Sequence, residues 1–114
     1  MRVKRIRGVY VEVGKEPRVI EFEDTLEEKQ RLVGGYIQMV CPRLHDDTAV
    51  VICNEEGKLL CLEPNRELFD EFGRIYAVLR GNFFIIDAPI DSDEFGSLSD
   101  EQIDKYIKMY GRLI

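Results

Sequence analysis

The stretch VVICNEEGKLLCLEPNR, residues 50–66, is the part of the sequence on which the fold prediction depends. Residues 49–53 form a continuous apolar run, which is typical of a central strand that is covered on both faces. Residues 54–57 have Asn first and Gly fourth, as a type I turn prefers. Residues 58–62, which are apolar from Leu59 onward, are predicted to return as a second strand, so that the stretch forms a hairpin.

The chain before this hairpin is predicted to begin with another hairpin. Residues 2–13 and 18–23 alternate between apolar and polar side chains with the period of a half-buried strand. Residues 14–17 contain a glycine and a proline and are predicted to form the turn.

Four of the first seven residues are basic: Arg2, Lys4, Arg5 and Arg7. Such a cluster can contact an anion or a nucleic acid. A charged edge strand that resists pairing with other chains is the interpretation we favour, because charged edges are common.

Two helices are predicted from their capping residues. Thr25 and Glu28 form a capping-box pattern at the start of a short helix, and Gly34 supplies its left-handed end. Ser99 and Gln102 form a second capping-box pattern. The helix that follows has an apolar face at helical spacing, consisting of Ile103, Tyr106, Ile107 and Tyr110.

The remaining segments complete an α+β prediction for one domain over residues 1–114. Strands are expected at residues 36–41, 75–79 and 83–86, and residues 66–72 are expected to form one or two helical turns with Leu68, Phe69 and Phe72 turned inward. This order predicts a mainly antiparallel sheet of about six to seven strands, with two helices and a short helical turn, and with the helices against one face. A β-grasp-like topology is the alternative, because the hairpin–helix–strand order also occurs in that fold.

Composition limits the classes of function. The chain has 114 residues, 45% of them hydrophobic, and a net charge of −6 with a pI of about 4.8. The acidic balance argues against a nucleic-acid binder that neutralises phosphates in bulk. No apolar run is long enough for a membrane span, and the basic first residues lack the apolar segment of a signal peptide. Three cysteines without disulfide-like spacing predict reduced thiols in a cytoplasmic protein.

No catalytic or metal site is predicted, and neither is a cofactor. The possible zinc ligands are Cys41, His45, Cys53 and Cys61, but they lack the paired spacing of structural zinc sites, and Cys53 and Cys61 fall in predicted apolar strands. No nucleophile motif accompanies His45, which is the single histidine. The acidic residues between Asp87 and Asp104 lack calcium-loop spacing and are interpreted as a solvated face.

The candidate binding residues lie in and beside the hairpin. Asn65 and Arg66 in the loop that begins at Pro64 combine an amide with a planar guanidinium fork, which suits carboxylates and phosphates. Asn54 and Lys58 of the predicted turn are the other candidates. A purely structural interpretation, in which Asn65 caps the helical turn and Arg66 forms a salt bridge, is the one we favour for this loop.

The sequence resembles domain-of-unknown-function family 3846, whose members are small domains of bacterial phages and mobile elements. The matching segments are residues 10–17, 32–37, 52–58, 62–66 and 98–103, which together extend over nearly the whole chain. The resemblance implies a cytoplasmic bacterial or phage protein and carries no catalytic residue. Where a further proline is expected before Pro64, this chain has Glu63.

The function expected from these observations is a non-enzymatic accessory domain that binds another macromolecule, most plainly a protein, in phage or mobile-element biology. The alternative is a small-molecule or anion-binding domain that uses the Pro64-Asn65-Arg66 loop. An enzyme is the least favoured class, because no constellation of catalytic residues stands out.

Overall fold

The computed structural model describes residues 4–40, 48–69 and 72–111. It contains seven strands and two helices in that part of the chain: β1 (Arg5–Val11), β2 (Arg18–Glu23), α1 (Leu26–Val33), β3 (Ile37–Val40), β4 (Ala49–Asn54), β5 (Pro64–Phe69), β6 (Ile75–Arg80), β7 (Phe83–Asp87) and α2 (Asp100–Met109). The strands form a five-stranded antiparallel sheet in the order β2-β1-β7-β4-β3 and a two-stranded sheet of β5 and β6. The predicted α+β class and the antiparallel pairing are confirmed.

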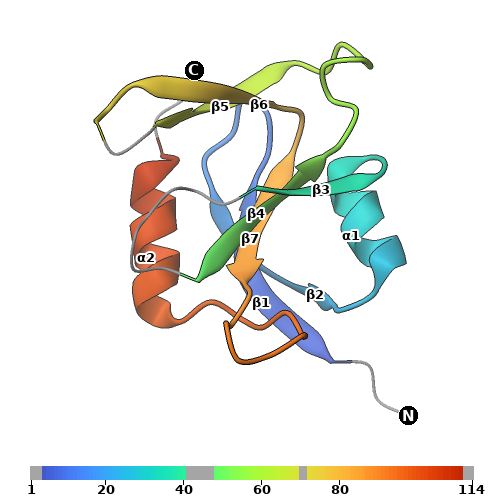
Figure 1. The fold of residues 1–114 in the computed structure, drawn as a ribbon, viewed down its shortest axis with the longest axis vertical. Helices are drawn as coiled ribbons and strands as arrows, with labels where there is room; N and C mark the ends of the chain where they lie inside the picture. The colour runs from blue at the N-terminus through green and yellow to red at the C-terminus, as the bar shows by residue number, and fades with distance from the viewer. Residues whose placement is uncertain (1–3, 41–47, 70–71, 112–114) are drawn as a thin grey trace.

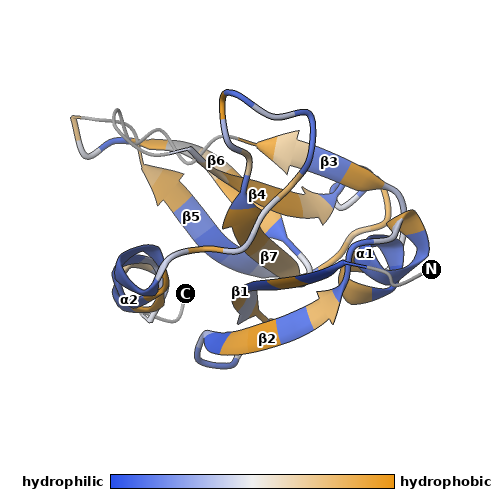
Figure 2. Ribbon diagram, turned by 90° about the horizontal axis from the view of Figure 1, so that it is seen from below, coloured by the Kyte–Doolittle hydropathy of each residue, from blue (hydrophilic) through white to orange (hydrophobic). Residues whose placement is uncertain are grey.

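The two helices cover opposite faces of the five-stranded sheet (Figures 1 and 2). One cluster of buried residues joins α2 and the β5–β6 sheet to the face that carries Val9, Val51 and Ile85. The other joins α1 to the face that carries Ile52 and Phe84. The prediction that both helices lie against one face was wrong, because β4 and β7 are apolar at every position from Ala49 to Cys53 and from Phe83 to Ile86 and so need cover on both sides.

β1 is an inner strand only where Val9–Val11 pair with β7, so Arg5 and Arg7 lie in the part that pairs with β2 alone among the strands, in keeping with the charged-edge interpretation. It pairs with β2 on one side and β7 on the other. Gly8 allows this close approach, since a Cβ there would lie 2.4 Å from the backbone oxygen of Ile85. The described basic side chains form ion pairs: Lys4 with Glu94 at 3.7 Å, Arg5 with Glu21 at 3.7 Å and Arg7 with Asp100 at 3.0 Å.

The predicted helix caps are present, with one difference. Ser99 and Gln102 form a complete capping box at α2, whose inner side buries Ile103, Tyr106 and Tyr110 as expected. At α1 the Thr25 hydroxyl accepts from the Glu28 amide, and Gly34 has φ of 77°. The Glu28 carboxylate, however, binds the guanidinium of Arg31.

The segment after β4 differs most from the prediction. Residues 58–62 form turns, with the Leu60 amide bonded to the Glu56 oxygen at 2.8 Å and the Leu62 amide to the Gly57 oxygen at 2.9 Å. The predicted return strand is therefore wrong, and Cys61 is exposed. The predicted helical turn is also wrong, because Pro64–Phe69 is strand β5.

β6 and β7 follow each other in the sequence, but they do not pair with each other. β6 pairs with β5, whereas β7 lies between β1 and β4. The chain passes from one sheet to the other at Gly81, which has φ of 78°. The β5–β6 sheet thus lies across one end of the molecule, near the C-terminal end of α2 (Figure 1).

Candidate functional site

Arg66, the main predicted binding residue, lies in the interior on the inner side of β5. Only 3% of the Arg66 surface is exposed to solvent. Nε donates to the Tyr110 oxygen at 2.8 Å, Nη2 to the Lys15 oxygen at 2.6 Å, and Nη1 to the Asn65 side-chain oxygen at 2.7 Å. Burial lowers the pKa of the Arg66 guanidinium below its usual value. All three nitrogens bond to uncharged oxygens of the protein.

Asn65 is fully buried beside Arg66 and uses both ends of its amide. Nδ2 donates to the Val11 oxygen and to the Gly81 oxygen, both at 2.9 Å. Oδ1 accepts from Arg66. We call Asn65 and Arg66 the clasp, since they tie the β5–β6 sheet to β1, to the β1–β2 turn and to the end of α2.

Asn54 and Lys58 are not brought together with the clasp. Asn54 is buried at the end of β4, where Nδ2 donates to the Val33 oxygen at 3.1 Å and Oδ1 accepts from the Glu56 amide at 2.7 Å. It therefore holds the end of α1 against β4. Lys58 is exposed in the turns that follow. Of the four predicted residues, Asn65 and Arg66 form the clasp, Asn54 joins α1 to β4, and Lys58 is exposed. The structure therefore does not bring them together into one site.

A groove of about 350 Å³ lies beside the C-terminal end of α1. Its wall from α1 runs from Arg31 to Gly34, and Leu62, Glu63, Gly81 and Asn82 form the opposite side. Tyr10 and Val13 contribute from β1 and the turn after it. We call this the α1 groove.

Hydrogen bonds fix the polar side chains of the α1 groove. The Tyr10 hydroxyl donates to the Leu32 oxygen at 2.6 Å, and the Asn82 oxygen accepts from the Val13 amide at 2.9 Å. Asn82 Nδ2 also approaches the Tyr10 hydroxyl at 3.4 Å. Burial is the main cause that raises the pKa of Tyr10. The phenol therefore stays neutral and continues to donate its hydrogen bond to the Leu32 oxygen.

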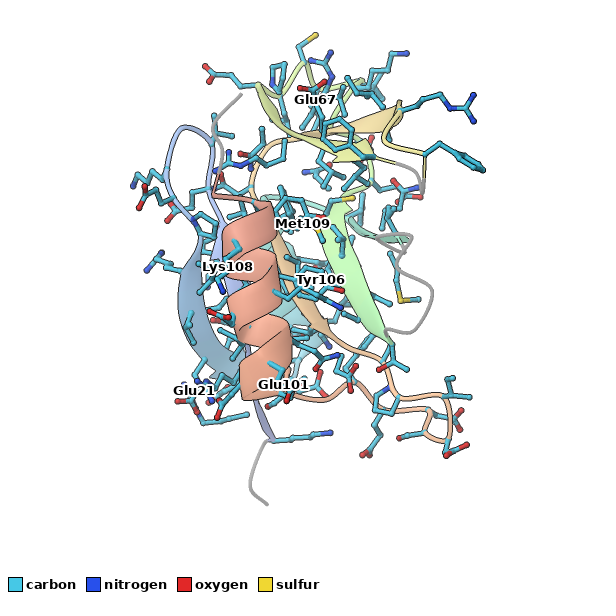
Figure 3. The ribbon with its side chains drawn as sticks, turned by 90° about the vertical axis from the view of Figure 1, so that its left-hand side faces the viewer. Glu21, Glu67, Glu101, Tyr106, Lys108 and Met109 are labelled. Atoms are coloured by element: carbon cyan, nitrogen blue, oxygen red, sulfur yellow. The ribbon has the colours of Figure 1, made fainter. Side chains whose placement is uncertain are left out.

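The outer side of the β5–β6 sheet carries exposed apolar residues. Phe69 and Ile75 are paired across the strands and Val78 is opposite Glu67, so all four side chains point to the same side. Phe69 is 51% exposed, Ile75 54% and Val78 43%. Phe72 lies in the connection, with the Arg74 guanidinium 5.2 Å from its ring. We call Phe69, Phe72, Ile75 and Val78 the outer surface; Figure 3 shows the neighbouring Glu67 at this end of the molecule.

The described residues contain neither a metal-binding cluster of side chains nor a helix that could span a membrane. Across residues 4–40, 48–69 and 72–111, no group of three or more His, Cys, Asp or Glu side chains could hold a metal ion. In the same residues, no helix combines the length and apolar character needed to cross a membrane. Cys41 and His45, considered above as zinc ligands, lie outside the described residues.

A family model described as "Domain of unknown function (DUF3846)" matches residues 6–111. The chain belongs to the DUF3846 family. No curated protein and no solved structure matches it. The family suggested by the quoted segments is therefore confirmed, and membership assigns this DUF3846 domain no activity.

Two of these features were missed by the sequence interpretation. Phe69 and Phe72 of the outer surface were expected to point inward from a helical turn, whereas Phe69 is an exposed residue of strand β5 and Phe72 is exposed after it. The α1 groove combines residues from four separate segments, and no spacing in the sequence of this DUF3846 domain brings them together.

Proposed function

We propose that this chain is a non-enzymatic accessory domain that binds a partner protein through the outer surface of the β5–β6 sheet. The observation that carries the proposal is the exposure of Phe69, Ile75 and Val78 on one side of a small sheet whose other side is buried, with the exposed Phe72 in the connection between its strands. A cytoplasmic location and a role in phage or mobile-element biology belong to the same proposal.

The chemistry of the outer surface suits a protein partner. A contiguous exposed apolar surface with a polar rim is characteristic of protein interaction sites. Phe69, Ile75 and Val78 provide the apolar centre, while Glu67 and Arg74 provide opposite charges beside it. The net charge of −6 gives no support to nucleic acid as the partner.

The alternative, an anion site at Pro64-Asn65-Arg66, has less support. A binding guanidinium has to be accessible to the ligand, but Arg66 is buried and its three nitrogens have protein acceptors. An anion would have to displace those carbonyl oxygens and disrupt the clasp. We therefore assign Arg66 to stability and the outer surface to binding.

Site-specific photo-crosslinking tests the proposal. A photoreactive residue at Val78 is expected to capture a discrete partner in cells that contain the native gene neighbourhood, and the same residue at Glu21, on the far edge strand β2, is the control. Capture should disappear in the variant Phe69→Thr/Ile75→Thr. Equal capture from both positions, or capture that survives the double substitution, would refute the assignment of the outer surface.

A further inference from the structure

The α1 groove offers a second site, independent of the outer surface. Its volume of about 350 Å³ lies at the small end of the range for pockets that hold small molecules. Because the groove is open and its sides come from α1 and from the segments around Leu62 and Asn82, a ligand can enter without movement of the sheets.

The groove has an apolar wall held in place before any ligand arrives. Leu32, Val33 and Leu62 line it, and the Tyr10 hydroxyl and the Asn82 oxygen are fixed by their bonds to backbone groups. A preformed wall lowers the entropy lost on binding. The wall therefore suits a ligand with an apolar side chain.

Two residues of opposite charge, Arg31 and Glu63, line the same groove. Arg31 reaches it from α1, and its bonds to Glu28 use Nε and Nη2, so that a carboxylate can approach through Nη1. Glu63 lies on the opposite side, where its backbone oxygen accepts from the Gly81 amide at 2.8 Å. A ligand carrying one charge of each sign would complement both.

We propose that the α1 groove binds a small zwitterion with an apolar side chain, such as a free branched-chain amino acid, with its carboxylate at Arg31 and its ammonium at Glu63. The apolar side chain then lies against Leu32 and Leu62. Neither the Arg31 nor the Glu63 charge is buried, so each ion pair contributes modestly to the affinity. Selectivity comes from the ligand matching both charges and the apolar wall at the same time.

Titration of the full chain with L-leucine, followed by amide NMR shifts, tests this proposal. Shifts are expected at Val13, Gly34, Gly81 and Asn82. N-acetyl-L-leucine lacks the ammonium and L-leucinamide lacks the carboxylate, so each should bind about fivefold more weakly. No saturable shift at millimolar leucine, or shifts outside the groove, would overturn the proposal.

Substitutions at Glu63 and Arg31 test which of the two residues binds the ammonium and which binds the carboxylate. In Glu63→Gln, leucine and its N-acetyl derivative should bind equally, and in Arg31→Gln, leucine and leucinamide should bind equally. The controls are Glu55→Gln and Arg5→Gln, which change exposed residues outside the groove. If both groove variants keep the leucine preference of the unmodified chain, the proposal is wrong. None of these substitutions touches the outer surface, so the result is separate from that of the crosslinking experiment.

Discussion

The five-stranded sheet and the β5–β6 sheet differ in how their faces are covered. In the first, α1 covers one face and α2 with the β5–β6 sheet covers the other, so β4 is buried along its whole length. In the second, the inner side buries Leu68 and Leu79, while the outer side exposes Phe69 and Ile75. The comparison separates residues that hold the fold from residues available to a partner.

Removing α2 should have the largest effect, because it uncovers one face of the five-stranded sheet. A chain lacking residues 98–114 exposes the face of the five-stranded sheet that Ile103, Tyr106 and Tyr110 cover, and it also loses the Tyr110 oxygen that binds Arg66. We expect no cooperative thermal transition in circular dichroism. Lys108→Gln, on the exposed side of α2, is the control and should melt like the unmodified chain. An unchanged melting curve for the truncated chain would contradict the burial described for α2.

Arg66→Ala should have the next largest effect. It removes the donor to the Tyr110 oxygen and to the buried Asn65 side-chain oxygen, and it opens a cavity under β5. Unsatisfied buried polar groups destabilise a protein by about 1–3 kcal/mol, so we expect a loss of about 2–3 kcal/mol in urea denaturation.

Arg74→Ala is the matched control for the clasp, since Arg74 lies over an exposed ring on the outer surface. It should change the free energy of unfolding by less than about 0.5 kcal/mol. If the Arg66→Ala variant is as stable as the Arg74→Ala variant, Arg66 is not needed for stability, and the alternative of a ligand site in the loop at Pro64 regains support.

Cys53 should make the stability of the five-stranded sheet sensitive to alkaline pH. Burial in β4 raises the pKa of its thiol from 9.0 to about 11. The folded state therefore favours the neutral thiol, and this contribution is complete below pH 9 and declines as the pH rises through 11. At pH 10 the folded chain should have lost about 1 kcal/mol of stability through this group.

Cys53→Ala should remove that part of the decline between pH 8 and pH 10, measured by urea denaturation at each pH. Cys61→Ala is the control, because Cys61 is exposed in the turns before β5. A decline that is identical in all three proteins would show that Cys53 ionises as easily in the fold as in the unfolded chain.

Substitution on the outer surface should affect stability least. Phe69→Thr keeps a strand-favouring residue and removes an aromatic ring that is half exposed. We expect the free energy of unfolding to change by no more than about 0.5 kcal/mol. A loss above about 2 kcal/mol would mean that Phe69 is covered within the chain itself, and the comparison between the two sheets would fail.

The parts of the fold that were predicted are those with local signals. β4 and β7 are continuous apolar runs, and α2 has both a capping box at Ser99 and an apolar face at helical spacing. These patterns need no knowledge of distant residues. The start and end of α1 were likewise predicted from Thr25 and Gly34.

Residues 58–72 were misread because local pattern and tertiary environment disagree there. Leu59 and Leu60 look like strand residues but are 77% and 53% exposed in turns. Conversely, Pro64-Asn65 looks like a break, yet Asn65 is a buried strand residue whose partners, Val11 and Gly81, are distant in sequence. The role of Arg66 depends on the same distant carbonyl groups, so the loop could be chosen as a candidate but its burial could not be predicted.

The position of β7 between β1 and β4 determines when the sheet can be completed during synthesis. The β1–β2 and β3–β4 pairs emerge from the ribosome first, and among the described strands only β7 pairs with both β1 and β4, so the sheet is incomplete until residues 83–87 have been made. Until then the apolar edges of β1 and β4 have no partner, and unpaired strands of this kind promote aggregation of nascent chains. Fragments of this chain that stop before residue 83 should therefore precipitate, whereas a chain that includes β7 joins its two halves into one sheet.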